Sequence, residues 1–256
     1  MKIVVCIKQV PARDSLLRTD ATGHWIQEQD LSWEINEPDA YALEAALQLK
    51  DQHGGEVIAL CAGPARASQT IREALAKGAD RALHIEDDGL SGLDTLGIAR
   101  LLAAALQTEA PDLVLTGLQS DDLGYGQTGV VIAELLGWVH STIIMQVEPH
   151  GEGIRVKREL EGGWFQYIEM PLPAVLTIQS GISKLRYATL MGIKKAKTKE
   201  IRKLAAAELG GIPAAVAAIS SVYLPRKEKK TELIEGSPTD AAEKLVEKLR
   251  FEVRAI

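Results

Sequence analysis

The sequence predicts an α/β fold with a doubly wound, mainly parallel sheet, an antiparallel extension and a C-terminal arm. Two observations support this prediction. Short apolar runs alternate with helical segments through the first half of the chain, and four strand-like runs then follow without a helix between them. At 256 residues the chain is long enough for one or two domains with a buried core.

The first half predicts four parallel strands joined by helices. Buried strands are expected at the short apolar runs 2–7, 56–61, 81–85 and 112–116. A helix is expected to begin at Asn36-Glu-Pro-Asp39, because Asn caps helices, Pro is tolerated in the first turn and acids suit the helix dipole. It runs to about Gln52, with later helices at 65–77, at 91–106 and from the end of the 117–125 loop to 136. Strands and helices in this order form right-handed parallel units, which gives the doubly wound sheet.

The next four segments predict the antiparallel extension. Strand-like runs occur at 141–147, 154–160, 164–170 and 174–179. Gly162-Gly163 lies between two of them and is typical of a hairpin. With these segments the expected α/β domain covers residues 1–183.

The remainder of the chain has a different composition. Residues 184–203 contain eight Lys or Arg and one acid, Glu200, which is typical either of a solvated face or of a basic recognition loop. Residues 204–256 form the C-terminal arm, with extended chain at 210–213 and 225–238 and an amphipathic helix at about 240–250. Because this arm has little core of its own, we expect it to pack on its own domain or on a partner subunit.

Composition excludes several classes of protein. The apolar runs are far shorter than the ~20 residues of a transmembrane helix, so direct membrane insertion is not expected. A net charge of −6 argues against nucleic-acid binding. Cys6 and Cys61 lie in apolar runs and predict buried thiols in a reducing, cytoplasmic compartment. The five histidines have no ligand-like spacing, so no metal site is expected.

The glycine-rich loop at 117–129 is the strongest candidate for a binding site. In a doubly wound sheet, ligands bind beyond the carboxyl ends of the strands. This loop should meet three other segments there, at residues 6–10, 36–39 and 62–64. Its glycines allow close approach of the backbone, and Gln127 and Thr128 stand at a helix N-terminus, which favours a phosphate group.

The same loop has two other interpretations. Gly124, Gly126 and Gly129 satisfy G-x-G-x-x-G, but they lie too far after the strand to be a nicotinamide fingerprint. A purely structural loop is the alternative to a nucleotide or other phosphate site. Asp121-Asp122 is interpreted as a loop cap or a ribose ligand rather than as an acid/base pair. With no nucleophile–base arrangement and no P-loop in the sequence, we expect binding without chemistry on a substrate.

Three stretches resemble the signature of the electron transfer flavoprotein β subunit: RELEGG at 158–163, LPAVLT at 172–177 and RYATLMGIKKAK at 186–197. Stretches earlier in the chain, at 4–10, 36–39, 61–64, 76–81 and 117–129, also match the family in the same order. The resemblance therefore covers nearly the whole chain. It implies a Rossmann-like, adenine-nucleotide α-hydrolase-like fold. It also implies an αβ heterodimer in which the C-terminal arm packs on the α subunit.

The resemblance further implies two cofactors. FAD would be held mostly by the α subunit, with this chain forming one wall, and a structural AMP would lie in the 117–129 loop. The residues implied in AMP binding are Cys6, Asn36, Asp39, Ala62, Gln119, Ser120, Asp121, Gly124, Gly126, Gln127, Thr128 and Gly129. The version of the loop with Gln119-Ser120-Asp121 and Tyr125 is most similar to β subunits linked to trimethylamine dehydrogenase.

The resemblance also implies a role in docking. The chain would accept electrons from partner dehydrogenases and pass them to a quinone oxidoreductase, as a carrier rather than an enzyme. Leu190 would be the apolar anchor for the dehydrogenase, surrounded by Lys194, Lys195 and Lys197. Glu159 and Arg186 would lie at the interface with the α subunit. Alternatives for these positions are a core leucine at 190 and an ordinary strand-surface carboxylate at 159.

Two other functions remain open from the sequence. The first is the β subunit of a bifurcating electron transfer flavoprotein, with a second FAD in place of AMP and with oxidation of NADH. The Gln-Ala-Ile-Asp-Gly-Asp pattern usual in that group is absent from this loop. The second is a free-standing module that binds ATP. The chain also departs from the family at Ser183-Lys-Leu185, where Asn-x-Pro is usual, which puts the geometry of the docking segment in doubt.

Overall fold

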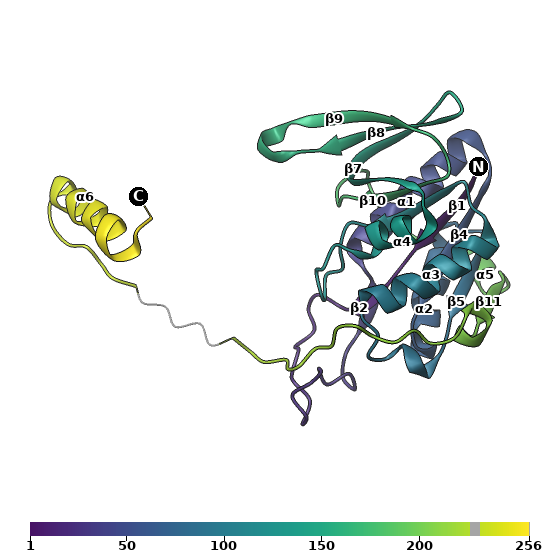
Figure 1. The fold of residues 1–256 in the computed structure, drawn as a ribbon, viewed down its shortest axis with the longest axis horizontal. Helices are drawn as coiled ribbons and strands as arrows, with labels where there is room; N and C mark the ends of the chain where they lie inside the picture. Colours follow the sequence, from purple (N-terminus) through teal and green to yellow (C-terminus); the bar gives the residue numbers. More distant parts are fainter. Residues whose placement is uncertain (226–230, 256) are drawn as a thin grey trace. The chain divides into compact units, whose positions relative to one another are not determined.

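A nine-stranded sheet organises residues 1–221, the first of two units into which the chain divides; the second is residues 222–256 (Figure 1). The structure is a computed structural model that describes residues 1–225 and 231–255. In sheet order the strands are β11 (Ile201–Leu204), β5 (Arg81–Ile85), β4 (Glu56–Ala62), β1 (Lys2–Cys6), β6 (Leu113–Gly117), β10 (Ala174–Ile178), β7 (Val139–His150), β8 (Gly153–Glu159) and β9 (Phe165–Met170).

The sheet is parallel from β11 to β7 and antiparallel from β7 to β9. This arrangement confirms the predicted mainly parallel sheet with an antiparallel extension. The prediction is wrong for β10, which lies between β6 and β7 and runs parallel to both. All five residues of β10 are buried, as expected for an interior parallel strand. Because β10 follows β9 directly in sequence, the pattern alone assigns it to the wrong side of the sheet.

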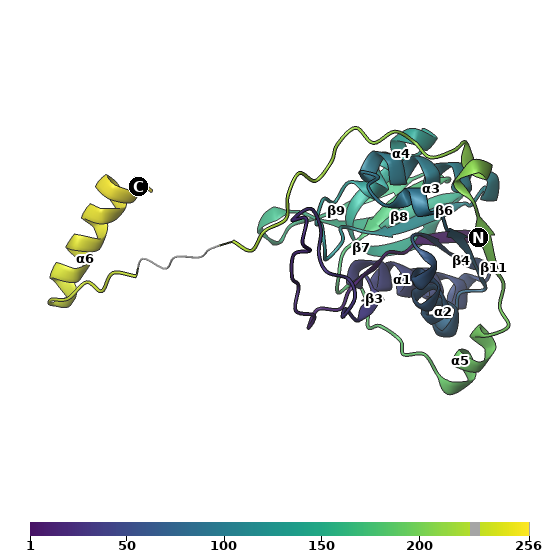
Figure 2. The same cartoon turned by 90° about the horizontal axis from the view of Figure 1, so that it is seen from below.

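Two pairs of helices cover the two faces of the sheet (Figure 2). Helices α1 (Glu37–His53) and α2 (Ser68–Lys77) pack on one face, where Ile3 and Val5 point. Helices α3 (Thr95–Glu109) and α4 (Thr128–Leu136) pack on the other, where Val4 points. Residues alternate between these faces along β1, and burying a side chain of this size contributes about 1.5–3 kcal/mol. This packing is that of a doubly wound fold.

A short two-stranded sheet, β2 (Gln9–Pro11) with β3 (Trp33–Ile35), lies between β1 and α1 in the sequence. Its pairing brings the chain from the end of β1 to the start of α1. The amide of Asn36 donates to the carbonyl oxygen of Lys8 at 2.9 Å. This small sheet therefore sets the first two predicted site segments side by side.

The basic segment 184–203 contains regular structure that the sequence analysis did not identify. Helix α5 (Leu190–Ala196) packs on α2, and β11 adds to the sheet next to β5. The next residues lead to Val216 and Ala217, whose amides donate to a carboxylate oxygen of Asp94 at 2.8 and 2.9 Å. Much of the region after residue 183 is thus part of the α/β unit.

In the described part of the second unit, 222–225 and 231–255, the chain forms helix α6 (Pro238–Glu247), continued by a π-helical turn at Lys248–Val253. Ser237 caps α6, since its hydroxyl accepts from the amide of Asp240 at 3.2 Å. A helix near 240–250 was predicted and is confirmed, although part of the extended segment expected at 225–238 lies outside the described residues. Among the described residues, no helix has the length and apolar character needed to cross a membrane.

Candidate nucleotide-binding site

The predicted site segments meet at the carboxyl ends of β1, β4 and β6. Asn36 contacts the loop after β6 directly, and the Nζ atom of Lys8 reaches Asp122 in the same loop. Gln9 donates to the hydroxyl of Thr70 at 2.9 Å, which connects β2 to α2, just beyond the 62–64 turn. The buried ring of His84, on β5, donates from Nε2 to the carbonyl oxygen of Gly63 in that turn at 3.1 Å.

Asn36 holds the glycine-rich loop through two backbone contacts. Its Nδ2 atom donates to the carbonyl oxygen of Gln119 at 3.0 Å, and its Oδ1 atom accepts from the amide of Asp121 at 2.9 Å. The prediction that Asn36 caps α1 with its side chain is wrong, because the side chain makes no cap hydrogen bond. The residue does stand immediately before α1, but its buried side-chain amide binds the loop instead.

Asp39 joins the ends of two strands. One carboxylate oxygen accepts from the amide of Lys8 at 2.8 Å and the other accepts from the amide of Gly117 at 2.9 Å. The carboxylate is buried, and burial raises its pKa to about 7 although the two amide hydrogen bonds act in the opposite direction. A Cβ at Gly117 would overlap the Asp39 carboxylate, so only glycine fits there.

Charged pairs line the rim of the site. Lys8 donates to Asp122 at 2.7 Å and lies 3.5 Å from the hydroxyl of Ser120. This pairing holds the pKa of Asp122 below its usual range despite partial burial. Arg13 pairs with Glu37 and lies 3.7 Å from Asp121. Sequence analysis missed Lys8, for which the only available signal was a cation just after the first buried strand.

The loop contains glycines in a left-handed conformation and leads into the start of α4. Gly124 and Gly126 have φ of +66° and +63°, a conformation that glycine adopts without strain. Gly129 lies in the first turn of α4, where a Cβ would meet the Thr116 hydroxyl at 2.6 Å. Gln127 makes no side-chain cap on α4. The first amides of this helix have no acceptor within it, so they can bind an anion.

Cys6 and Ala62 end their strands at the same edge. Cys6 is buried in the cluster that α3 and α4 cover, and burial raises the pKa of its thiol. Burial likewise raises the pKa of the Cys61 thiol to about 12, so both cysteines are neutral thiols at physiological pH. Ala62 is partly exposed beside Gly63. Neither residue supplies a charge to the site.

The sequence comparisons identify the family. A model described as the electron transfer flavoprotein domain matches residues 24–209. A relative named electron transfer flavoprotein subunit beta, from Methylophilus methylotrophus, is 37% identical over 257 residues, covering 96% of this chain and 97% of the relative. The chain belongs to this family. Proteins of the same name from Sus scrofa and Bacillus subtilis are 39% and 36% identical, covering 82% and 90% of this chain and 81% and 91% of their own lengths.

Membership of the electron transfer flavoprotein β subunits confirms the resemblance found in the sequence. It indicates an electron-carrier subunit rather than an enzyme. The matched region 24–209 contains the Asn36 turn and the whole 117–129 loop.

The residues expected to dock a partner lie on and around α5. Leu190 begins this helix and is 88% exposed, so it is not a core residue of this chain. Lys194, Lys195 and Lys197 are also exposed. At the departure from the family pattern, Leu185 packs against the core instead of the usual proline.

The two residues expected at the α-subunit interface have different surroundings. Glu159 ends β8, is half-buried and accepts from the side chain of Gln179 at 3.4 Å. Arg186 is occupied within the chain, since its guanidinium group pairs with Glu44 at 2.8 Å and with Asp51 at 2.9 Å on α1. Both contacts of Arg186 raise its pKa, so it is a permanent cation.

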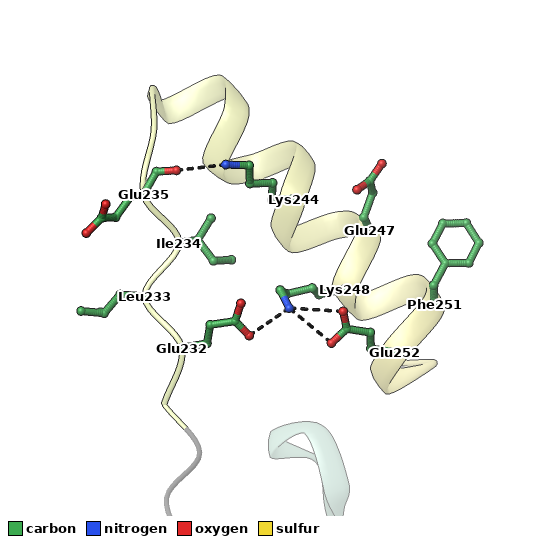
Figure 3. Close-up of a pocket in the computed structure, with 9 residues that line it drawn as sticks. All are labelled: Glu232, Leu233, Ile234, Glu235, Lys244, Glu247, Lys248, Phe251 and Glu252. Carbon is green, nitrogen blue, oxygen red and sulfur yellow. Dashed lines mark hydrogen bonds and ion pairs between the residues drawn. The ribbon is translucent and has the colours of Figure 1, made fainter.

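A groove of about 440 Å³ lies within residues 222–256, between the 232–235 segment and α6 (Figure 3). Lys248 pairs there with Glu232 at 2.9 Å and with Glu252 at 3.2 Å. In Figure 3, Ile234 points toward α6, while Leu233 and Phe251 point away to opposite sides. The exposed fractions of Leu233 and Phe251 are 83% and 70%. None of its described lining residues is buried.

Proposed function

We propose that this chain is the β half of a heterodimeric electron transfer flavoprotein. It would accept electrons from partner dehydrogenases, pass them to a quinone oxidoreductase, bind a structural AMP and form one wall of an FAD site held mostly by the α subunit. The two buried, unpaired cysteines are consistent with our proposal of a cytoplasmic location.

The observation that carries this proposal is the preformed loop after β6. Asn36 fixes its backbone at Gln119 and Asp121, and α4 begins directly after it without a side-chain cap. A phosphate group fits the helix terminus because both the free amides and the helix dipole favour negative charge there. The residues present therefore fit a mononucleotide such as AMP.

The proposed AMP ligands fall into two groups. The side chains of Asn36 and Asp39 are already bonded to backbone groups, so we assign them to shaping the site. We assign direct contacts to the other residues proposed for the site: Cys6, Ala62, Gln119, Ser120, Asp121, Gly124, Gly126, Gln127, Thr128 and Gly129. Of these, Ser120 and Thr128 offer hydroxyl groups, and Gln127 offers an amide.

FAD would supply the redox chemistry, since it takes up and releases single electrons. This chain contributes surfaces to that assembly rather than redox groups. We assign Glu159 and Arg186 to the interface with the α subunit. We assign the 222–256 arm to packing on that subunit, because Leu233, Phe251 and Val253 are all more than half exposed within the arm. Burial of these side chains against a partner would favour association.

The α5 surface is the proposed docking site for dehydrogenases. Leu190, Met191 and Ile193 are exposed next to Lys194 and Lys195. A cluster of apolar side chains contributes affinity once it is buried, and the surrounding positive charge speeds encounter with an acidic partner. This segment is exposed and basic although the chain as a whole has a net charge of −6.

Electron acceptance is tested on the purified αβ complex. The flavin absorbance is followed after mixing, under anaerobic conditions, with trimethylamine dehydrogenase and trimethylamine, or with NADH alone. We expect reduction by the dehydrogenase and none by NADH. Reduction by NADH alone would establish the bifurcating alternative, and reduction by neither donor would contradict the carrier function proposed here.

A further inference from the structure

Helix α5 is fixed to α2 by two contacts that form a reciprocal pair. Arg72 on α2 donates through Nη1 to the carbonyl oxygens of Ala196 at 2.5 Å and of Lys199 at 3.0 Å. Lys199 donates in return through Nζ to Leu75 at 3.1 Å and to Ala79. Arg72 thus binds carbonyls at and just beyond the carboxyl end of α5, and Lys199, three residues after α5, binds carbonyls at and just beyond the carboxyl end of α2. A helix carries partial negative charge at this end.

The packing between the two helices is close. A Cβ at Gly192 would overlap the carbonyl oxygen of Ala76, so only glycine allows α5 to lie at this position. Ala196 is 3% exposed and belongs to the core cluster beneath α1 and α2. Thr189 caps the other end of α5, because its hydroxyl accepts from the amide of Gly192 at 3.0 Å.

The chain is anchored on both sides of this helix as well. Before it, Arg186 pairs with the buried carboxylate of Glu44 and with Asp51 on α1. After it, β11 pairs with β5, and the amide of Ala82 donates to the carbonyl oxygen of Glu200 at 3.0 Å. Residues 187–195 lie between Arg186 and Ala196, whose carbonyl oxygen Arg72 holds. In this stretch Tyr187, Leu190 and Met191 are 89%, 88% and 63% exposed.

A seven-residue helix with a central glycine is not stable on its own in water. Its conformation must therefore come from these contacts. A partner that buries Leu190 would bind a helix that is already ordered, and would not have to order it during binding. The contacts with α2 therefore increase the affinity for the partner, because they order the helix before the partner binds.

We propose that Arg72, with Lys199, is a positioning residue for dehydrogenase docking: it holds α5 in the conformation that presents Leu190 to the partner. This inference rests on the docking function proposed for α5. It adds a group on α2 that touches neither the partner nor the flavin.

The test uses the αβ complex and the dehydrogenase assay described above. Arg72→Met removes the donors and keeps the aliphatic stem, whereas Arg72→Lys keeps one cationic donor. If α5 is ordered for about a tenth to a fifth of the time without Arg72, the KM for the complex rises about fivefold to tenfold. The kcat at saturation stays unchanged, and Arg72→Lys recovers part of the loss. Lys199→Met changes KM in the same direction.

Two further measurements separate this role from a merely structural one. Hydrogen exchange at residues 190–196 is expected to become about tenfold faster in Arg72→Met, with no change elsewhere in the sheet. Leu190→Ala is expected to raise KM in the wild-type complex and to add little in the Arg72→Met complex, because the two residues act through one surface. Arg100→Met, an exposed change on α3 across the sheet, is the matched control and leaves KM unchanged.

The outcomes distinguish the inference from the function on which it rests. A wild-type complex that the dehydrogenase does not reduce overturns both. A wild-type complex that is reduced, with an Arg72→Met variant of normal KM, overturns the positioning role alone. The positioning role is also overturned if the variant has a lower kcat, a higher KM and a lower global stability together, since that pattern shows only damage to the fold.

Discussion

The loop site at the strand ends and the 222–256 arm differ in how far along the sequence their polar contacts reach. In the site, hydrogen bonds join residues 31, 83 and 114 positions apart. In the arm, the corresponding contacts join residues 3, 4 and 9 positions apart. Long-range contacts exist only when the whole α/β unit is folded, so the site is a product of the fold. The polar contacts of the described arm residues span at most the 16 positions between Glu232 and Lys248, which is typical of a segment that is completed by a partner.

The apolar side chains show the same difference. The α/β unit buries large side chains such as Leu43, Ile58 and Leu115 completely. In the arm, α6 has no buried residue. A helix of this length gains most of its stability from packing of its apolar face, so α6 is expected to find that packing on the α subunit. We therefore expect changes in the arm to weaken association with the α subunit, and changes at the loop site to alter the stability of the α/β unit or its affinity for AMP.

The largest effect is expected from removing the arm. A chain ending at Ser221 should fold and keep its sheet, because the 1–221 unit contains the core clusters. Its association with the α subunit should weaken by at least about a hundredfold, since the apolar anchors of an interface carry most of its affinity. Co-expression followed by size-exclusion chromatography measures this. A truncated chain that still forms a stable αβ complex would show that the arm is not a principal interface. Phe251→Asp in the full chain is a milder version of the same test.

The next effect concerns the carboxylate that joins β1 to β6. Asp39→Asn leaves only one acceptor for two amides and places an NH2 group against one of them, which should cost about 1–3 kcal/mol of stability. Denaturant unfolding of the full-length chain measures the loss. Asp30→Asn, in an exposed loop, is the control and should be close to neutral.

Asp39 also predicts a pH dependence. Its pKa is about 3.9 when unfolded and about 7 in the fold. Between these values the folded chain holds the proton more tightly, so the stability due to Asp39 is fully present below the lower pKa and is lost as the pH rises through the upper one. The free energy of unfolding of the wild type, minus that of Asp39→Asn, should fall across this range. A flat or rising difference would mean that the two amides outweigh burial.

A smaller effect is expected at the chain's single asparagine. Asn36→Ala releases the loop at Gln119 and Asp121 while leaving the core intact. AMP should bind about tenfold more weakly to the nucleotide-free complex, because one donor and one acceptor of the loop lose their partners. Titration calorimetry measures the affinity, with Gln52→Ala near the other end of α1 as the control. If wild type and Asn36→Ala bound AMP with equal affinity, the conformation of the loop would not depend on Asn36.

Local signals in the sequence were sufficient for much of the fold. Apolar runs located the first four strands of the parallel sheet, and the glycine-rich loop before α4 was recognisable from its composition and position. The features that these local signals did not predict depend on contacts between residues far apart in the sequence. The place of β10 between β6 and β7 follows from strand order, which no single segment encodes. Helix α5 is short and contains Gly192, so its order comes from Arg72 and Lys199 rather than from its own residues.

The sequence predicted which segments converge more accurately than it predicted the contacts of their side chains. Asn36 and Asp39 were placed correctly at the start of α1, but their side chains bond to the backbone of Gln119 and Gly117, which lie 83 and 78 positions away. Sequence spacing cannot show such bonds. Lys8 was missed for the same reason, because its partner Asp122 is 114 positions away.

The central claim is that this chain holds AMP at the loop after β6 while the α subunit holds the flavin. It is tested most directly by purifying the αβ complex, denaturing it and quantifying the released nucleotides by chromatography. The account predicts one FAD and one AMP for each αβ pair. Two FAD and no AMP would contradict it, since the loop would then hold a second flavin.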